Sequence, residues 1–245
     1  MFQPRTYRQK ANNARFHYFN ATFRETDLWI GTDHASYRAG MPLFVNGTIA
    51  MLRKIIEDYT LQRPSFVTTH EPVLPEGWEP VPVQLLMRAG SAAGVGPMAA
   101  VAGLFSKWIG EALIQHYNPE ECVVENGGDI FASIAHPLKM AIHAGGSPLS
   151  EKVALNIPPG SWGVATSSGT VGHSVSYGTA DAVTVLDPSP PLADAWATAI
   201  ANTIRNKADL QAVARSYENT NDFQALILIK DDQVAITGDT ELVPG

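Results

Sequence analysis

The sequence has a single cysteine, Cys122, among its 245 residues. One thiol excludes an intramolecular disulfide and any zinc or iron–sulfur site built on several cysteines. Because Cys122 lies at the start of an apolar segment, we expect it to be an inert thiol in the core. Charged residues are also scarce, at 17%, and the net charge is −7. Nucleic acids and anionic membranes attract basic surfaces, so this balance argues against both as general partners.

Long apolar runs are missing as well. The N-terminal sequence MFQPRTYRQKANNARF is basic but leads into no apolar signal-peptide core, and we therefore expect a cytoplasmic protein. Residues 89–106 carry no charge, but they include four glycines, one proline and few large aliphatic side chains. Since a bilayer span needs about 20 strongly apolar residues, this segment predicts a buried helix and no membrane span.

The apolar content of 45% is sufficient for a buried core. No repeat or low-complexity linker divides the chain, so we predict one domain over residues 1–245, with residues 1–14 loosely ordered. Strands occur in runs interrupted by helices, which favours an α+β fold with antiparallel sheets. Helical spacing predicts helices near 49–63, 83–93, 97–117, 192–205 and 208–217. Alternating or apolar segments between turn residues predict the strands FHYFNATF, LWIGT, ECVVE, DIFASI, KMAIHA, KVALNI, GVATS, VGHSVSY and AVTVLD and a final hairpin, FQALILIK and VAITG.

Glycine and serine gather in three segments, 90–103, 126–130 and 166–179. None has the spacing of a phosphate-binding P-loop or of a dinucleotide fingerprint. Such segments expose backbone N–H groups that can hold phosphates, but they serve equally in tight turns and close helix packing. Residues 126–129, Asn-Gly-Gly-Asp, are typical of a hairpin turn. The turn interpretation leaves the role of Asp129 open.

Asp194 and Thr198 are four residues apart on a predicted helix, so their oxygens lie on one face. A carboxylate and a hydroxyl, together with a backbone carbonyl and phosphate oxygens, would suit Mg²⁺. The alternative is structural: Asp194 would stabilise the start of its own helix, and Thr198 would bond back to a carbonyl.

A Ser/His/Asp hydrolase site could be drawn from Ser168, His173 and Asp181, but the G-x-S-x-G turn is absent. His136 and His143 lack a further ligand at zinc-site spacing, so a zinc centre is not predicted.

Five segments resemble one family: ETDL (25–28), VGPMAAVAG (95–103), VENGGDI (124–130), TSSGTVGHS (166–174) and ADAWATA (193–199). The family is the uncharacterised prokaryotic ApbE-like family, a distant relative of the ApbE FAD:protein FMN transferases. The resemblance runs over residues 20–240 and implies an ApbE-like fold of the T-fold type. ApbE transferases bind FAD with Mg²⁺, cleave its pyrophosphate, release AMP and attach FMN to a Thr or Ser of a protein acceptor.

The resemblance also implies site residues. The metal would be held by Asp194, Thr198 and a backbone carbonyl at Ala99. From their position in the sequence, and not from the resemblance, His173 or Asp181 is the candidate acid–base group for activating an acceptor hydroxyl. The ligands implied are FAD and Mg²⁺, with a protein acceptor as partner. The residues implied to line the nucleotide pocket are Asn126, Gly127, Gly128, Asp129, Thr166, Ser167, Ser168, Gly169, Thr170, His173 and Ser174.

Two departures support an alternative. ApbE transferases have a Lys-Gly step where this chain has Ala102-Gly103, and only residues 173–177 correspond to their H-I-x-D-P segment. Members of the ApbE-like family have been linked with sulfide incorporation into homocysteine. The chain could therefore act without turnover, as a binding or assembly factor with a sulfur-pathway partner. The sequence leaves open whether the protein forms a homodimer. Ser168-Gly169-Thr170 also weakly resembles the acceptor sequence of flavinylated proteins.

Overall fold

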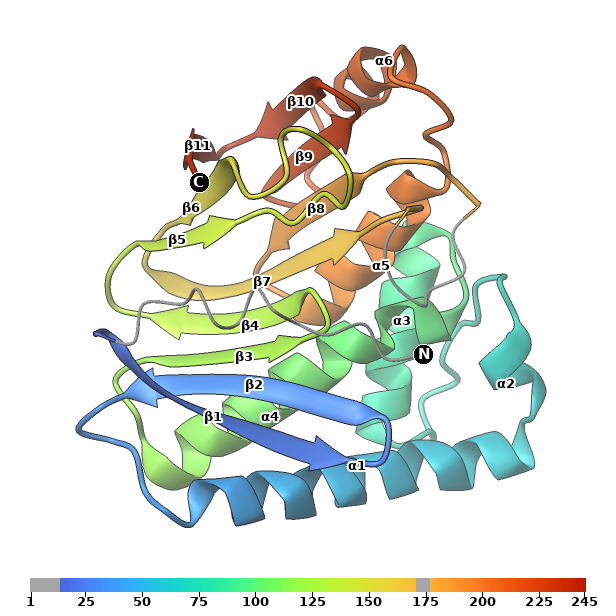
Figure 1. The fold of residues 1–245 in the computed structure, drawn as a ribbon. Helices are drawn as coiled ribbons and strands as arrows, with labels where there is room; N and C mark the ends of the chain where they lie inside the picture. The colour runs from blue at the N-terminus through green and yellow to red at the C-terminus, as the bar shows by residue number, and fades with distance from the viewer. Residues whose placement is uncertain (1–13, 171–176) are drawn as a thin grey trace.

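The computed structural model describes residues 14–170 and 177–245. Its largest element is an eight-stranded antiparallel sheet, which runs through most of the described chain (Figure 1). A three-stranded antiparallel sheet of order β11-β6-β5 lies beside it. The large sheet contains, in spatial order, β1 (Phe16–Phe23), β2 (Thr26–Asp33), β3 (Cys122–Asn126), β4 (Asp129–Ile134), β7 (Gly160–Ser167), β8 (Ala182–Asp187), β9 (Ala225–Lys230) and β10 (Gln233–Gly238). The small sheet contains β11 (Glu241–Pro244), β6 (Val153–Ile157) and β5 (Leu138–Ala141).

The helices cover the face of the large sheet opposite the small sheet. α4 packs on β3 and β4, α5 on β7 and β8, and α6 on β9 and β10. Proline occupies the first turn of several helices, where its missing N–H is harmless. The helical elements are α1 (Met41–Gln62), α2 (Ser65–Thr68), α3 (Val81–Ala93), the 3₁₀ turn η2 (Pro97–Ala100), α4 (Val101–Tyr117), α5 (Pro190–Ala201) and α6 (Asp209–Ser216).

Strand β9 shows that both faces of the large sheet are covered. Leu226 and Leu228 pack with α5 and α6, whereas Ile227 and Ile229 pack with the small sheet. Every apolar residue of this strand is buried. A continuous apolar sequence is therefore the expected pattern for β9, because neither of its faces meets solvent.

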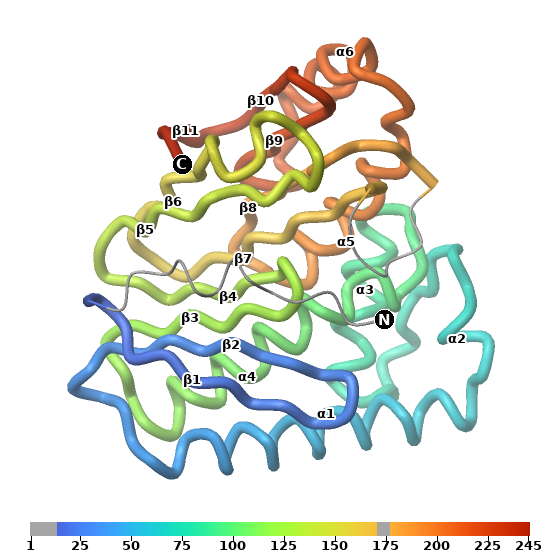
Figure 2. Tube along the Cα trace, in the orientation of Figure 1, coloured from blue at the N-terminus to red at the C-terminus, as the bar shows by residue number. Residues whose placement is uncertain are grey.

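Several turns and strand termini lie next to one another at one end of the central strands of the large sheet (Figure 2). The β3–β4 turn lies beside the end of β7, since Asp129 pairs with Ala165. The end of β7 lies beside the start of β8, and the start of β8 beside the β9–β10 turn. This end of the strands gathers residues 126–129, 166–170 and 181, which come from three separate segments of the chain.

The predicted α+β fold with antiparallel sheets is confirmed, with local differences. The strand predicted over 139–144 ends at Ala141, because the chain turns at Gly145 with φ 52°. The helix predicted over 192–205 runs from Pro190 to Ala201. Helix α2 and strand β11 were not predicted. The strand predicted at 171–177 lies almost wholly outside the described residues, as do residues 1–13.

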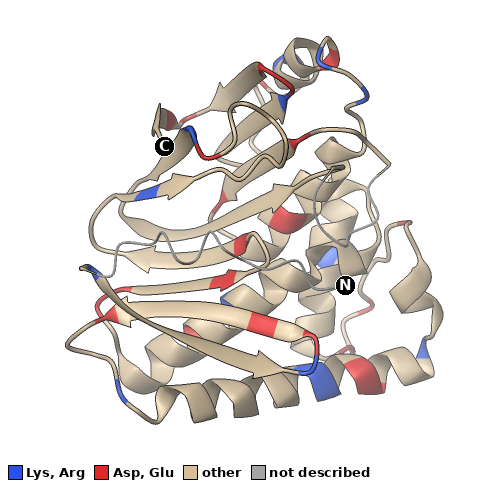
Figure 3. Ribbon diagram, in the orientation of Figure 1, with Lys and Arg blue, Asp and Glu red and all other residues tan. Residues whose placement is uncertain are grey.

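No single helix among the described residues is long and apolar enough to span a bilayer. Only α3 together with η2–α4 reaches that length and hydropathy, and this pair is bent by 104°. In the view of Figure 3, Lys and Arg lie scattered among Asp and Glu over the described elements.

Candidate functional site

Three distant segments meet at the N-terminus of α4. The Gly103 N–H donates a hydrogen bond of 2.8 Å to the Asp194 Oδ2 atom, from α5. The Asn126 side-chain amide, at the end of β3, donates one of 3.1 Å to the Ala102 carbonyl. No side chain of α4 itself caps this end. Asp194 therefore satisfies the first turn of a helix other than its own, which corrects the expectation that it stabilises the start of α5.

Two glycines allow these elements to approach so closely. A Cβ atom on Gly103 would lie 2.4 Å from the Pro190 carbonyl oxygen and 2.9 Å from the Asp194 Cβ atom. A Cβ atom on Gly163, in β7, would lie 2.4 Å from the Pro190 Cα atom. Larger residues at either position would push α5 away. The first turn of α5 is thus wedged between α4 and β7, and Asp194 is fixed by this packing.

Asp194 is a buried carboxylate without a cation. Its residue exposure is 8%, and burial raises its pKa to about 7, although the N–H groups of Gly103 and Ala102 act in the opposite direction. Among residues 14–170 and 177–245, no Lys or Arg forms an ion pair with it. Because a buried charge is costly without a partner, this site favours either a protonated acid or a carboxylate that binds a cation.

Thr198 is half-buried one helical turn after Asp194. Thr203 donates its hydroxyl back to the Ile200 carbonyl at 2.7 Å, and Thr48 does the same to Phe44 at 2.9 Å. The Thr198 hydroxyl has no hydrogen-bond partner among the described residues, which is contrary to the expectation that it bonds back. Ala99 lies in η2, which packs against α5. A carboxylate, a hydroxyl and a backbone carbonyl thus occur on two elements that pack together, and these are oxygen ligand types that Mg²⁺ accepts.

The turn over 126–129 is the predicted two-residue hairpin loop. Asn126 pairs with Asp129, and Gly127 and Gly128 adopt φ values of 70° and 110°. The Glu125 carboxylate accepts the Gly128 N–H at 3.0 Å. The Gly128 carbonyl accepts the Thr166 N–H at 3.2 Å, so the turn and the end of β7 are directly joined.

Residues 166–170 continue from the end of β7 towards a second group of polar residues, the cluster around Asp181. The hydroxyls of Thr166 and Thr184 lie 2.9 Å apart. The Gly169 N–H donates to the Ala180 carbonyl at 2.9 Å, and a side chain on Gly169 would clash with the Gly178 carbonyl. This closeness holds the segment before β8 against the end of β7. Ser167 and Ser168 lie on the same stretch, whereas His173 and Ser174 lie outside the described residues.

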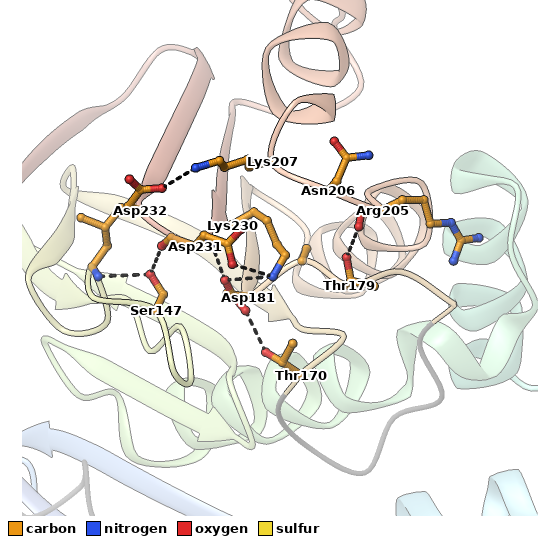
Figure 4. A network of polar contacts seen from close by, with 12 residues as sticks. Ser147, Thr170, Thr179, Asp181, Arg205, Asn206, Lys207, Lys230, Asp231 and Asp232 are labelled. Atoms are coloured by element: carbon orange, nitrogen blue, oxygen red, sulfur yellow. Dashed lines mark hydrogen bonds and ion pairs between the residues drawn. The ribbon is translucent and has the colours of Figure 1, made fainter.

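Asp181 is the centre of this second cluster (Figure 4). Its carboxylate accepts the Thr170 hydroxyl at 3.2 Å and the Asp231 N–H at 2.6 Å. The Lys230 ammonium lies 3.6 Å from the same carboxylate, and its pKa is raised by hydrogen bonding to Asp231 and by the charge of Asp181. A pocket of about 450 Å³ lies beside the cluster. Gly146, Ser147, Pro148, Thr170, Asp181, Asp231 and Asp232 line it.

The structure thus sorts the predicted residues into two groups. Asp194 and Asn126 meet at the α4 N-terminus, and Thr170 and Asp181 meet at the start of β8. Sequence reasoning missed Lys230, which appeared only as the last residue of a hairpin strand. Cys122 lies in the core, as the sequence predicts. It is fully buried, and burial raises the pKa of its thiol to about 12.

The solved structures that share this architecture include flavin transferases. The flavin transferase ApbE from Vibrio cholerae superimposes with a TM-score of 0.57 over 91% of this chain and 97% of its own, at 16% identity. The apo flavinyl transferase ApbE from Pseudomonas stutzeri gives 0.53 over 91% and 94%, at 13% identity. At such identities the likeness establishes the fold, which is that of the ApbE class.

The chain belongs to the AbpE bacteria family, whose profile matches residues 8–234. A UPF0280 protein of Archaeoglobus fulgidus is 35% identical over 90% of this chain and 91% of its own. UPF0280 protein MJ1526 of Methanocaldococcus jannaschii is 38% identical over 75% and 76%. A UPF0280 protein of Methanosphaerula palustris is 45% identical over 62% of this chain, and the matched part spans slightly less than two thirds of that relative, 65%. The predicted membership of an ApbE-like family is confirmed.

Proposed function

We propose that this protein binds FAD together with Mg²⁺ and transfers FMN from it to a protein acceptor. The observation that carries the proposal is the buried Asp194 carboxylate at the N-terminus of α4, which has no described cationic partner. The Thr198 hydroxyl, one turn away and without a described partner, supports it. The ApbE fold and the family membership make a flavin nucleotide the natural ligand.

In this proposal Asp194, Thr198 and the Ala99 carbonyl hold the metal. Mg²⁺, when bound, would neutralise the pyrophosphate of FAD and stabilise the departing AMP. The N–H groups at the start of α4 favour negative charge nearby. Residues 126–129 and 166–170, joined through Gly128 and Thr166, would shape the nucleotide pocket.

The acid–base groups are proposed to be His173 and Asp181. The Lys230 ammonium lies 3.6 Å from the Asp181 carboxylate, which also accepts the N–H of Asp231, and a carboxylate held in place in this way is a candidate general base. Its Oδ1 atom already accepts the Thr170 hydroxyl, so a hydroxyl group does approach this carboxylate. An acceptor hydroxyl would have to replace Thr170 there or reach His173.

One observation favours a second function. Ala102 stands at the step where the ApbE transferases have lysine, so this chain lacks that cation beside the phosphates. The protein could then bind a flavin nucleotide without turnover, as a binding or assembly factor in sulfide incorporation. Both functions place the nucleotide at the same junction, and only AMP release separates them.

The first experiment is a calorimetric titration of the metal-stripped protein with FAD, with and without Mg²⁺. We expect binding that strengthens with Mg²⁺, followed by AMP release when a protein acceptor is supplied. Mg²⁺-dependent binding with no AMP release would favour the assembly function. FAD binding absent in both conditions would contradict both functions as stated.

A further inference from the structure

The outer face of α1 carries exposed apolar side chains. No described element packs on this side, where α1 forms the lower boundary of the molecule in Figure 1. The inner face packs on the core through residues such as Val45 and Leu52. On the outer face Leu43, Met51 and Leu61 are 79%, 58% and 79% exposed. A surface helix normally turns polar side chains to solvent, so these three residues distinguish this face.

The exposed residues of α1 are also regularly spaced. From residue 47 onwards they are Gly47, Met51, Lys54, Asp58 and Leu61, with Gln62 at the end of the helix. Steps of four, three, four and three residues place the first five on one narrow seam along the helix. Two helices that pack side by side in a coiled coil meet through seams with this spacing. The spacing therefore favours a second helix as the element that covers this face.

The order of the residues on this seam is complementary to itself. Two copies of α1 can run antiparallel about a two-fold axis that is level with residue 56. Met51 then lies opposite Leu61 of the second copy, and Lys54 lies opposite Asp58 of the second copy. Because such a contact is the same on both copies, each of the two pairs occurs twice. Apolar side chains thus meet apolar side chains, and each lysine meets an aspartate.

Other arrangements of the same two helices lack this match. A parallel pair places Lys54 against Lys54 and Asp58 against Asp58, and like charges at an interface disfavour association. An antiparallel pair shifted by seven residues places Lys54 opposite Met51 and Asp58 opposite Gly47, which leaves both charges without a partner across the interface. The order of residues therefore selects one antiparallel register.

The charges around the seam are compatible with this register. Lys54 and Asp58 form a pair at 2.7 Å within one helix, but their side chains are 73% and 54% exposed. The lysine precedes the acid, which is the weaker order in a helix, and so exposed a pair contributes little to stability. The charged residues beside the seam are already paired, since Glu57 lies 3.1 Å from Arg24 and 3.3 Å from Arg53. A second copy would therefore add charge pairs without leaving any of these groups unpaired.

We propose that α1 is the interface of a homodimer in which two copies of the helix pack antiparallel, with Met51 against Leu61 and Lys54 against Asp58. The four layers of contacts extend over about 15 Å of helix. An interface of this size is small, so we expect a reversible dimer with a dissociation constant in the micromolar range. The proposal does not rest on the proposed function, because neither Asp181 nor Asp194 belongs to α1.

Sedimentation velocity of the full-length protein over a range of concentrations tests the dimer. The wild type should show a monomer–dimer equilibrium in which the dimer fraction rises with concentration. Met51→Glu puts a carboxylate into two apolar layers and should weaken the dimer at least about tenfold. Leu74→Glu is the matched control, because it makes the same kind of change at a residue outside α1 that is 76% exposed, and it should leave the dimer unchanged. Both positions are exposed, so both variants should fold, which circular dichroism checks.

The charged layers give a second and sharper test. Lys54→Glu and Asp58→Lys each create two like-charge contacts in the antiparallel register, and each variant alone should dimerise at least about tenfold more weakly than the wild type. In an equimolar mixture of the two variants every contact between charged residues joins opposite charges. The mixture should therefore form a heterodimer about as stable as the wild-type dimer.

Three results would overturn the proposal. One is a wild-type protein that is still monomeric at several hundred micromolar. Another is a dimer that Met51→Glu and Lys54→Glu leave unchanged, since such a dimer forms through a different surface. The third is a mixture of Lys54→Glu and Asp58→Lys that stays as monomeric as its components, which would contradict the pairing of these two residues across the interface.

Discussion

Two buried aspartates, Asp181 and Asp194, are held in opposite ways. Asp181, 5% exposed, accepts a hydroxyl and a backbone N–H and has the Lys230 ammonium 3.6 Å away. Asp194, 8% exposed, accepts only backbone N–H groups among the described residues, and burial raises its pKa. The Asp181 cluster supplies its own cation, whereas the Asp194 junction leaves a negative charge to be neutralised by a proton or by a ligand.

This difference supports the proposed place of an external cation. A metal at Asp181 would compete with Lys230, which already stabilises the carboxylate. A metal at Asp194 would relieve a burial penalty that no described side chain offsets. Sequence reasoning placed the metal at Asp194 and an acid–base role at Asp181, and the charges around each residue are compatible with that division.

The largest expected effect is the loss of metal-dependent binding in Asp194→Asn. Asparagine keeps an oxygen for the N–H groups of α4, so the helix junction should survive, but the negative charge is gone. We expect the Mg²⁺-dependent part of FAD affinity to fall more than about 100-fold, since even indirect metal-site changes cost about 10–100-fold. Calorimetry with and without Mg²⁺ measures this. Asp181→Asn is the matched control and should retain the Mg²⁺ dependence; equal losses in both variants would erase the distinction between the clusters.

Lys230→Met is expected to leave Asp181, like Asp194, as a buried carboxylate without a described cationic partner. Removing one partner of a mostly buried ion pair leaves an uncompensated carboxylate, and we expect a loss of about 3 kcal/mol in the free energy of unfolding. Urea denaturation at neutral pH measures it. The double variant Asp181→Asn/Lys230→Met should recover much of that loss. A single variant as stable as the wild type would show that Lys230 does not compensate Asp181.

The two clusters also show what a sequence can predict. The Asn-Gly-Gly-Asp turn was predictable because its glycines encode the required positive φ values locally. The contact between Gly103 and Asp194 joins residues 91 apart, and the only sign of it was a stretch of small residues. Lys230 and Asp181 meet because β8 and β9 are neighbours, which strand propensity does not specify. Strand β11 forms by pairing with β6, and four residues carry too little pattern to predict it.

The smallest expected effect is on the pH dependence of stability. The pKa of Asp194 is about 7 in the folded, metal-free protein and about 4 in an unfolded chain. Between these values the folded state keeps a proton that the unfolded state has lost. Stability must therefore fall as pH rises, by on the order of 2 kcal/mol between about pH 5 and 7 from this group.

The measurement is a series of urea denaturations of the metal-stripped protein across that range. The seven histidines also titrate there, so the informative quantity is the difference between wild type and Asp194→Asn. That difference should grow in favour of the variant as pH rises, because asparagine has no charge to bury. Saturating FAD with Mg²⁺ should reverse it, since only the wild type keeps a carboxylate for the metal. Parallel stability curves for the two proteins would mean that the pKa of Asp194 is the same in the folded and the unfolded chain, so that the burial of its charge is already compensated.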